Sequence, residues 1–333
     1  MILMRAVQAT SFGAPSVLTV TELPDPVPGP GEIAIDVTHS AVGLVDVLMR
    51  RGVFKDQPGM PQPPYVPGLE VAGTVRAIGA GVTGFTPGEP VVSMSAAGTG
   101  GYASVYVAPA ALVVSTAGYG IEPGLAVSVV PNAAMAHVAL TQVAHLAEGE
   151  SVLVHGALGG FSAAFPGIAR QLGASRVVGT VRTGKLAAAA DTRLPYDKIV
   201  DSADLSTALA DEKFDVVIDP VGGQLRTRSL SLLRPGGRLI AAGNASDDWT
   251  HQIDSNQLWL GSVTISGFNA GAFLPTHPQH IRPALRAALT AVAAGLGETV
   301  VDVLPFREAA IAHQRMEDRT LRGRLVLTSA DRS

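Results

Sequence analysis

A glycine-rich turn at residues 156–162, reading GALGGFS, is the stretch whose residue types best fit ligand chemistry. An apolar run at 152–154 precedes it, and a helical segment and a second apolar run follow it. Strand, turn, helix and strand in this order form a βαβ unit, in which a turn of small residues lets a pyrophosphate approach backbone N–H groups. We therefore predict cofactor contacts at Gly156, Ala157, Leu158, Gly159, Gly160, Phe161, Ser162 and Thr180.

The residues after the second apolar run indicate which nucleotide binds. NAD-preferring folds carry an Asp or Glu there, which binds the ribose hydroxyls. This chain has Arg182, Thr183 and Lys185 instead, with no acid before Asp191. Guanidinium and ammonium groups form charge-assisted hydrogen bonds with phosphate oxygens, so Arg182 and Lys185 favour a 2′-phosphate and hence NADP(H). The alternative is that both cations belong to a solvated loop.

Composition limits the other classes of function. The chain has 333 residues, 47% of them hydrophobic and 16% charged, which fits two folded domains. The net charge of −4 and the 5% aromatic content do not indicate a basic, aromatic surface for binding nucleic acid. The chain has no cysteine, which excludes disulfides and thiolate metal sites. The apolar run at the N-terminus is too short for a signal peptide, and no uninterrupted apolar stretch reaches the ~20 residues of a membrane span. We expect a soluble cytoplasmic protein without a membrane partner.

The pattern of predicted secondary structure changes near residue 123. Short strands and glycine or proline turns fill the first part, including an alternating strand at 32–38, and they predict a compact β-barrel-like domain. An Ala-rich helix at 125–146 follows, and strands and helices then alternate, as in a parallel sheet. The predicted strands are 151–155, 176–181, 198–200, 214–219, 237–242 and 262–267. We also expect a helix end and tight turn at 233–237 and a last strand at 323–327 that rejoins the first domain. A helix near 281–292 is expected to place six apolar residues on one face: Ile281, Ala284, Leu285, Ala288, Leu289 and Val292.

Six segments, in order along the chain, resemble the zinc-independent quinone oxidoreductases of the medium-chain dehydrogenase/reductase superfamily. They are PGLEVAG at 67–73, GFTPGE at 84–89, VHGALGG at 154–160, DVVIDPVGG at 215–223, LRPGGR at 233–238 and RGRLVL at 322–327. The resemblance implies an α/β fold with a GroES-like β-barrel domain (1–122 and 270–333) and a Rossmann domain with a doubly wound parallel sheet (123–269). It also implies NADPH as cofactor, a quinone or enone as small-molecule substrate, and a homodimer.

Zinc-using members of this superfamily place a ligating Cys and a ligating His at two positions that can be checked here. The positions are occupied by Gly43 and Leu69, and the eight histidines are scattered without ligand spacing. Catalytic zinc needs at least three protein ligands. We therefore expect no metal, so that hydride transfer relies on the cofactor and on positioning. The candidate proton donors or oxyanion stabilisers are Tyr65, Tyr102 and Asp46, which the resemblance implies lie near the expected cleft. A packing or structural role is the alternative for each of them.

The chain departs from the family at several positions. Gly43 stands where many relatives have an Asn, and Met135 where many have a Thr beside the nicotinamide, so both are expected in the substrate pocket. Ser162 replaces the last glycine of the usual turn, and its hydroxyl is available for a phosphate. Pro166 lies in the following helix without an explanation from the sequence. By resemblance, the remaining cofactor contacts are Val221, Gly243, Asn244, Phe268, Asn269 and Arg319, for which loop packing is the alternative.

Three functions remain open. The first is an NADPH-dependent reductase of quinones or enones without a metal. The second is a reductase of enoyl thioesters, or a tailoring enzyme for polyketide-like intermediates, with a pocket widened by Gly43 and by the flexible Met135. The third is a nucleotide-binding protein without turnover.

Overall fold

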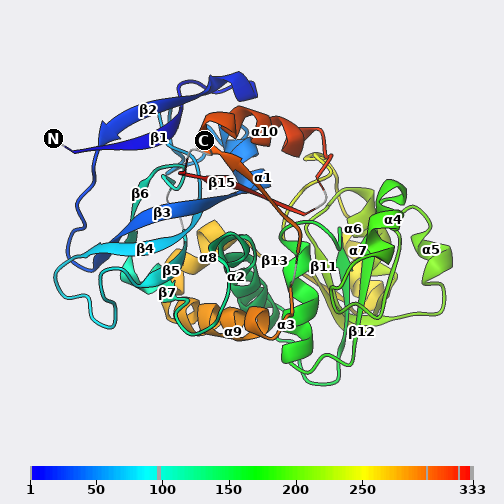
Figure 1. Ribbon diagram of the computed structural model, residues 1–333. Helices are drawn as coiled ribbons and strands as arrows, with labels where there is room; N and C mark the ends of the chain where they lie inside the picture. Colours follow the sequence, from blue (N-terminus) through cyan, green and yellow to red (C-terminus); the bar gives the residue numbers. More distant parts are fainter. Residues whose placement is uncertain (1, 96–98, 298, 322, 331–333) are drawn as a thin grey trace. The chain divides into compact units, whose positions relative to one another are not determined.

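The computed structural model describes residues 2–95, 99–297, 299–321 and 323–330 (Figure 1). The chain folds into two units. Unit 1 comprises Met1–Pro131, His277–Leu289 and Thr299–Ser333, and unit 2 comprises Asn132–Thr276 and Thr290–Glu298. Arg322, which begins the last family-like segment, lies outside the described residues.

Unit 1 contains a seven-stranded sheet with the order β14-β15-β3-β4-β5-β7, in which β6 also pairs with β3, and a separate β1-β2 hairpin. The long strand β3 pairs with three neighbours and is buried along most of its length, which explains why it extends beyond the alternating segment expected at 32–38. The last strand pairs antiparallel with β3, which confirms the prediction that the C-terminus rejoins the first domain. The strands and helices are β1 Leu3–Ala9, β2 Leu18–Pro24, β3 Glu32–Val42, β4 Glu70–Ile78, β5 Pro90–Met94, β6 Val105–Pro109, β7 Val113–Ser115, β14 Val301–Pro305, β15 Arg324–Thr328, α1 Leu44–Arg50 and α10 Ala309–Glu317.

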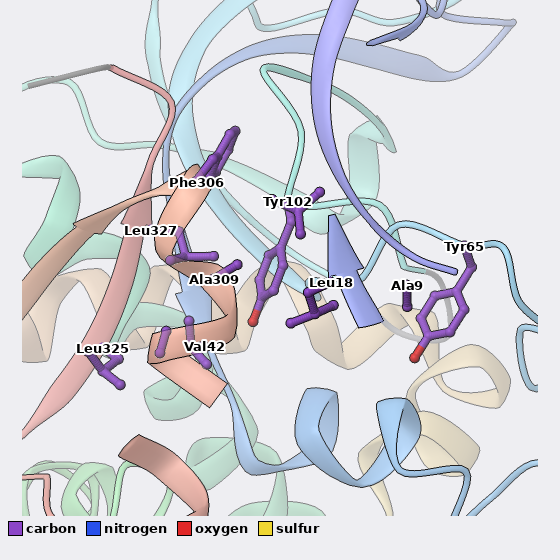
Figure 2. Close-up of a cluster of buried hydrophobic side chains, with 11 residues drawn as sticks. Ala9, Leu18, Val42, Tyr65, Tyr102, Phe306, Ala309, Leu325 and Leu327 are labelled. Atoms are coloured by element: carbon purple, nitrogen blue, oxygen red, sulfur yellow. The ribbon is translucent and has the colours of Figure 1, made fainter. Parts of the chain in front are cut away.

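One buried cluster joins the hairpin, β3, β15 and α10 within unit 1. Figure 2 shows the rings of Tyr65 and Tyr102 among aliphatic side chains from these elements, including Leu18, Val42 and Leu325. Tyr102 is fully buried and Tyr65 is 7% exposed. This cluster therefore surrounds the rings of both tyrosines with apolar side chains.

Unit 2 contains a six-stranded sheet with the order β10-β9-β8-β11-β12-β13, and all of its pairings are parallel. The predicted strands 151–155, 176–181 and 214–219 are confirmed at their bounds. The elements are β8 Ser151–His155, β9 Arg176–Val181, β10 Lys198–Asp201, β11 Phe214–Asp219, β12 Leu233–Ala241, β13 Thr264–Gly267, α3 Phe165–Gln171, α4 Leu186–Ala190, α5 Leu205–Ala208, α6 Gln224–Leu230, α7 Ser255–Gly261 and α8 Ala270–Thr276. This order is that of a doubly wound sheet.

The start of β12 differs from the expectation. We expected a helix end and turn at 233–237, but Leu233 already pairs with Phe214, and the next pairing joins Arg238 to Val216. The residues between Leu233 and Arg238 are therefore accommodated as a bulge inside the strand. A proline and two glycines tolerate this irregularity because they need neither a regular ladder nor a side chain.

Two helices, α2 Pro123–Val138 and α9 Ile281–Ala293, contain residues of both units. The six residues predicted for one apolar face of α9 are all buried. Helix α2 continues as a π-helical turn, Ala139–Val143, so the expected helix ends earlier than residue 146. Together these segments form a 21-residue helix that by length and composition is apolar enough to cross a membrane, although polar residues such as Asn132 and His137 interrupt its apolar sequence. Its most apolar window is 72% buried in the protein, as in the core helix of a soluble fold.

The position of Pro166 becomes clear from where the helix begins. A short 3-10 turn, Ser162–Ala164, precedes α3, and Pro166 lies in the first turn of α3. Backbone N–H groups in a first turn have no partner within the helix, so a proline removes no hydrogen bond there. Pro166 is therefore compatible with a regular helix after the glycine turn.

Candidate functional site

The glycine turn lies at the carboxyl end of β8, where the sheet of unit 2 reverses its strand order. Strand β8 lies between β9 and β11, and ligands of doubly wound sheets bind beside such a switch point. Gly156 has φ 64°, and a Cβ at this residue would lie 3.4 Å from Val221 Cγ2. The loops that follow β8 and β11 therefore approach each other closely at this edge, with the predicted cofactor residues Gly156 and Val221 side by side.

Hydrogen bonds within the turn leave some of its backbone donors available. The N–H of Ala157 donates to Thr180 O at 2.8 Å, and the N–H of Gly159 donates to Gly156 O at 2.7 Å. Within the described part of the chain, the N–H groups of Leu158, Gly160 and Phe161 have no hydrogen-bond partner. These three residues are partly exposed. Such N–H groups form a site suited to an anion.

Two of the predicted contacts have side chains that serve the turn itself. The Ser162 hydroxyl donates to His155 O at 2.8 Å and is 2% exposed, so it does not present its proton to a phosphate, contrary to the prediction. Thr180 is fully buried, with its hydroxyl 2.9 Å from His155 Nδ1. The hydroxyl of Thr180 therefore contacts the protein interior, and its role as a cofactor contact stays a prediction. A small hydroxyl side chain can hydrogen-bond to nearby backbone, as Ser162 does here.

Buried polar groups that the sequence analysis missed hold the turn in place. The Tyr196 hydroxyl donates to Ala157 O at 3.1 Å and to Ser162 O at 3.3 Å. His155 bridges the Thr180 and Ser229 hydroxyls, and burial lowers its pKa to about 4, so it is neutral at physiological pH. Tyr196 is distant in sequence, and only the pairing of β10 with β9 brings it to the turn.

The two predicted phosphate-binding cations follow β9. Arg182 is exposed and directly precedes a 3-10 turn, Thr183–Lys185, which it closes by accepting the Lys185 N–H at 2.7 Å. The neighbouring strand β10 ends at Asp201, a carboxylate that hydrogen-bonds the Thr183 side chain. The sequence analysis found no acid at this place because Asp201 belongs to the next strand.

A buried ion pair shapes the loop after β11. The Asp219 carboxylate is fully buried and accepts the N–H groups of Val221 at 2.8 Å and Gly222 at 2.9 Å. Arg226 Nε donates to the same carboxylate at 2.5 Å, while its Nη2 donates to Gly243 O at 2.7 Å. Arg226 therefore fastens the loops after β11 and β12 to each other. No motif marks Arg226, although a basic residue shortly after a buried Asp was a signal for it.

The loop after β12 and the connector after β13 complete this edge of the sheet. The Ser246 hydroxyl donates to Asn244 Oδ1 at 3.1 Å, and the Ser246 N–H donates to Val221 O at 2.8 Å. Phe268 is 5% exposed, and its N–H donates to Ala241 O at 2.9 Å. Asn269 Oδ1 accepts the N–H of Gly271 at 3.0 Å. Four of the predicted contacts thus follow neighbouring strands at one edge: Gly243, Asn244, Phe268 and Asn269.

The remaining predicted residues belong to different parts of the chain. Met135 is a partly exposed residue of α2 in unit 2, and Gly43 directly precedes α1 in unit 1. Arg319 lies in the turn after α10 of unit 1, with φ 55°, and its N–H donates to Met316 O at 3.2 Å. The assignments of Met135, Gly43 and Arg319 remain predictions.

In unit 1, Asp46 ties two glycine segments together. Its Oδ2 accepts the Gly43 N–H at 2.8 Å, and its Oδ1 accepts the Gly68 N–H at 3.1 Å. The carboxyl group is buried, and burial raises its pKa to about 6. Gly68 has φ 96°, and a Cβ there would lie 2.5 Å from Tyr102 Cδ1, so only glycine fits. Asp46 thus orders the backbone at Gly43 and Gly68.

Tyr102 links Asp46 to the C-terminal part of unit 1. Its hydroxyl hydrogen-bonds Asp46 and lies 3.2 Å from His313 Nε2. Burial, together with the nearby Arg50, lowers the pKa of His313 to about 3. Burial raises the pKa of Tyr102, so its hydroxyl stays protonated. Two of the three candidate catalytic residues, Asp46 and Tyr102, therefore form one buried network.

Other charged groups of unit 1 are buried nearby. Burial raises the pKa of Glu70 to about 7, and Arg324 Nη2 lies 3.2 Å from its Oε2. Arg50 is fully buried; it donates to Gly13 O at 2.6 Å and pairs with Glu317 of α10. The third candidate, Tyr65, has a buried hydroxyl without a partner in the described part of the chain, and burial raises its pKa to about 12.

Among the described residues, no group of three or more His, Cys, Asp or Glu side chains is arranged to hold a metal ion. Gly43 and Leu69 stand at the two positions where the family resemblance places the zinc ligands of zinc-using relatives. Neither residue has a side-chain donor atom.

Comparison with known proteins agrees with this architecture. The alcohol dehydrogenase GroES-like domain model matches residues 29–118, and the zinc-binding dehydrogenase model matches residues 194–327. The quinone oxidoreductase of Lama guanicoe is 32% identical over 249 residues, which cover 73% of each protein. The human quinone oxidoreductase is 28% identical, with 94% of each chain covered.

Solved structures extend the likeness to the whole chain. The human synaptic vesicle membrane protein VAT-1 homolog-like protein is 28% identical, with a TM-score of 0.83 and both chains fully covered. A mycobacterial protein solved in complex with NADPH is 29% identical, with a TM-score of 0.82, and 98% of this chain and 99% of that chain are covered. The chain therefore belongs to the quinone oxidoreductase family of the medium-chain dehydrogenase/reductase superfamily.

Proposed function

We propose that this protein is an NADPH-dependent reductase that transfers hydride to a quinone or an α,β-unsaturated carbonyl without a metal. The observation that carries the proposal is the glycine turn at the switch point of the unit 2 sheet. Its N–H groups at three residues have no partner in the described chain, and the exposed Arg182 follows at the end of β9. The NADPH-bound mycobacterial relative and the curated quinone oxidoreductases support it.

In this proposal the residues of unit 2 hold the cofactor. The N–H groups of Leu158, Gly160 and Phe161 receive the pyrophosphate, because they are partly exposed and lack protein partners in the described chain. Arg182 and Lys185 receive the 2′-phosphate. The clamp formed by Asp219 and Arg226 keeps the loops after β11 and β12 in the shape that the cofactor requires.

Bound NADPH supplies the hydride. The chain contributes orientation through the loops described above, and Asp46 fixes the Gly43 and Gly68 backbones. Reduction of a quinone consumes one hydride and one proton, and water supplies the proton, since Asp46 and Tyr102 are buried and occupied with each other. The absence of donor side chains at Gly43 and Leu69 supports a reaction without zinc.

The test is a titration of the purified protein with NADPH and with NADH, followed by cofactor fluorescence, and then turnover of a panel of quinones, enones and enoyl thioesters. We expect NADPH binding and quinone or enone reduction. Arg182→Gln should weaken NADPH binding about tenfold, because it removes a charge-assisted hydrogen bond. Arg234→Gln, near the start of β12 at the amino ends of the strands, is the matched control and should leave NADPH binding unchanged. Turnover of enoyl thioesters alone would favour the second candidate, and cofactor binding without any turnover would favour the third.

We also propose that the protein is a cytoplasmic homodimer. In the described chain, β13 is an edge strand with one hydrogen-bonded neighbour, β12, and the preceding helix α7 exposes Trp259 (76%) and Leu260 (74%). An edge strand beside exposed large apolar side chains fits a second copy of the chain. Analytical ultracentrifugation of the wild type and of Leu260→Glu tests this: the wild type should be a dimer and the variant should dissociate. A monomeric wild type would contradict the proposal.

A further inference from the structure

Asp201 brings a negative charge to the place where the proposed function expects a 2′-phosphate. Strand β10 runs parallel to β9, and Asp201 is in register with Val181, the residue before Arg182. The chains stay together past the strands, since the Ser202 N–H donates to Val181 O at 2.8 Å. The last residue of β10 and the first residue after β9 are therefore close neighbours.

The contacts of Asp201 keep its carboxylate ionised. The Thr183 side chain hydrogen-bonds it, and the Ala203 N–H donates to Oδ1 at 2.9 Å; both interactions lower its pKa. Thr183 lies between Arg182 and Lys185, the two cations that are predicted to bind the phosphate. In the structure its hydrogen bond is given to a carboxylate instead. The phosphate region thus contains an anion as well as two cations.

We propose that Asp201 is a specificity-determining residue that offsets Arg182 and lets the site accept NADH as well as NADPH. This inference rests on the proposed function. A carboxylate repels the doubly charged 2′-phosphate and accepts a hydrogen bond from the 2′-hydroxyl of NADH. In NAD-preferring folds an acidic residue accepts this hydrogen bond from the ribose hydroxyl, although there it follows the second strand of the βαβ unit. Here the acid, Asp201, ends β10, and the cation, Arg182, follows β9.

The direction of the effect follows from the charges. Asp201→Asn keeps an oxygen for the Thr183 hydroxyl and the Ala203 N–H, and it removes only the negative charge. For exposed groups several ångströms apart in a high dielectric, this charge is worth about three- to tenfold in the ratio of NADPH to NADH affinity. NADPH binding should therefore strengthen, and NADH binding should weaken or stay the same.

The experiment measures the dissociation constants of both reduced cofactors, by fluorescence at low ionic strength, for the wild type, Asp201→Asn and Asp211→Asn. Asp211 is an exposed acid shortly before β11, at the amino ends of the strands, so its variant makes the same change in net charge at the opposite edge. We expect the affinity ratio to rise about three- to tenfold in Asp201→Asn and to stay unchanged in Asp211→Asn.

Two results would overturn the inference: an unchanged affinity ratio in Asp201→Asn, with or without an equal loss of affinity for both cofactors, or the same rise in the ratio in Asp211→Asn. An equal loss would mean that Asp201 only supports the turn at Thr183. Because Arg182→Gln is measured separately, these results leave the proposed function intact. A wild type that binds neither cofactor would overturn the proposed function itself, and this inference with it.

Discussion

The charged groups of the two units are treated in opposite ways. In unit 1, Arg50 is fully buried and Asp46 and Glu70 are largely enclosed, each with partners that order the backbone or neutralise the charge. At the carboxyl edge of the unit 2 sheet, Arg182 is exposed and Asp201 is accessible. Buried charges cost free energy unless they are paired, so they fix structure. Exposed charges are screened by solvent and contribute little to stability, so they remain available to interact with a ligand and to determine which ligand binds.

The largest expected effect is on the free energy of unfolding, when buried and exposed arginines are replaced. Arg50→Leu should lower the free energy of unfolding by about 3 kcal/mol, because Glu317 and Gly13 O lose their partner in a buried setting. Arg51→Leu, at the next and exposed position, and Arg182→Leu should each change it by less than about 0.5 kcal/mol. Urea unfolding of the variants measures this. Equal effects at Arg50 and Arg51 would refute the contrast.

A second test concerns the two glycines that Asp46 holds. Gly68→Ala places a Cβ 2.5 Å from Tyr102 Cδ1 at a positive φ, and it should cost about 2–4 kcal/mol. Gly43→Ala places a Cβ 3.3 Å from Asp46 Oδ2 with an ordinary φ of −104°, and it should cost less than about 1 kcal/mol. Thermal unfolding of both variants is the measurement. A tolerant Gly68 would show that Tyr102 can move aside.

A third test compares the buried histidines of the two units. At pH 8, His155→Leu should destabilise by about 1–3 kcal/mol because Thr180 and Ser229 lose their shared partner. His313→Leu should cost less, because Nδ1 has no partner among the described residues and only Tyr102 is affected. Urea unfolding at pH 8 decides, and a costlier His313→Leu would contradict the prediction.

Both histidines also predict a dependence on pH. Each folded pKa lies below the ordinary 6.5, at about 4 for His155 and about 3 for His313, so below pH 6.5 the unfolded chain binds more protons than the folded one. Stability is therefore lost as the pH falls through this window. Asp46 and Glu70 act in the opposite sense, since their raised pKa values favour the folded state in acid. Each His→Leu variant should show a smaller loss of stability than the wild type as the pH falls from about 6.5 to about 4.5 in urea unfolding.

The smallest expected effect is that of ionic strength on the preference for NADPH over NADH. Raising the salt concentration should reduce any preference for NADPH over NADH, because salt screens the attraction between the exposed Arg182 and the 2′-phosphate. Screening of Asp201, which repels the phosphate, acts in the opposite sense and keeps the reduction small. The urea midpoint should not fall in parallel. Parallel titrations and unfolding curves at low and high salt test this. A preference unaffected by salt would indicate that buried groups select the cofactor.

The sequence by itself determined the architecture of unit 2 and the place of the glycine turn. Three strands were predicted at their bounds because short apolar runs between turn residues have little freedom in a parallel sheet. The apolar face of α9 followed from its helical period in the same way. The cations after β9 were also predictable, because residues close in the sequence share one end of a strand.

Only the tertiary structure decided which polar groups meet. The sequence pattern assigned Thr180 and Ser162 to ligand contacts, but His155 engages both hydroxyls inside the protein. Arg226 and Asp201 were missed because their partners come from other strands. Hydrogen bonds and charge pairs depend on distance in space, and apolar periodicity depends on distance along the chain. The strands and the turn therefore follow from the sequence alone, while the folded structure determines which charges stay exposed to a ligand.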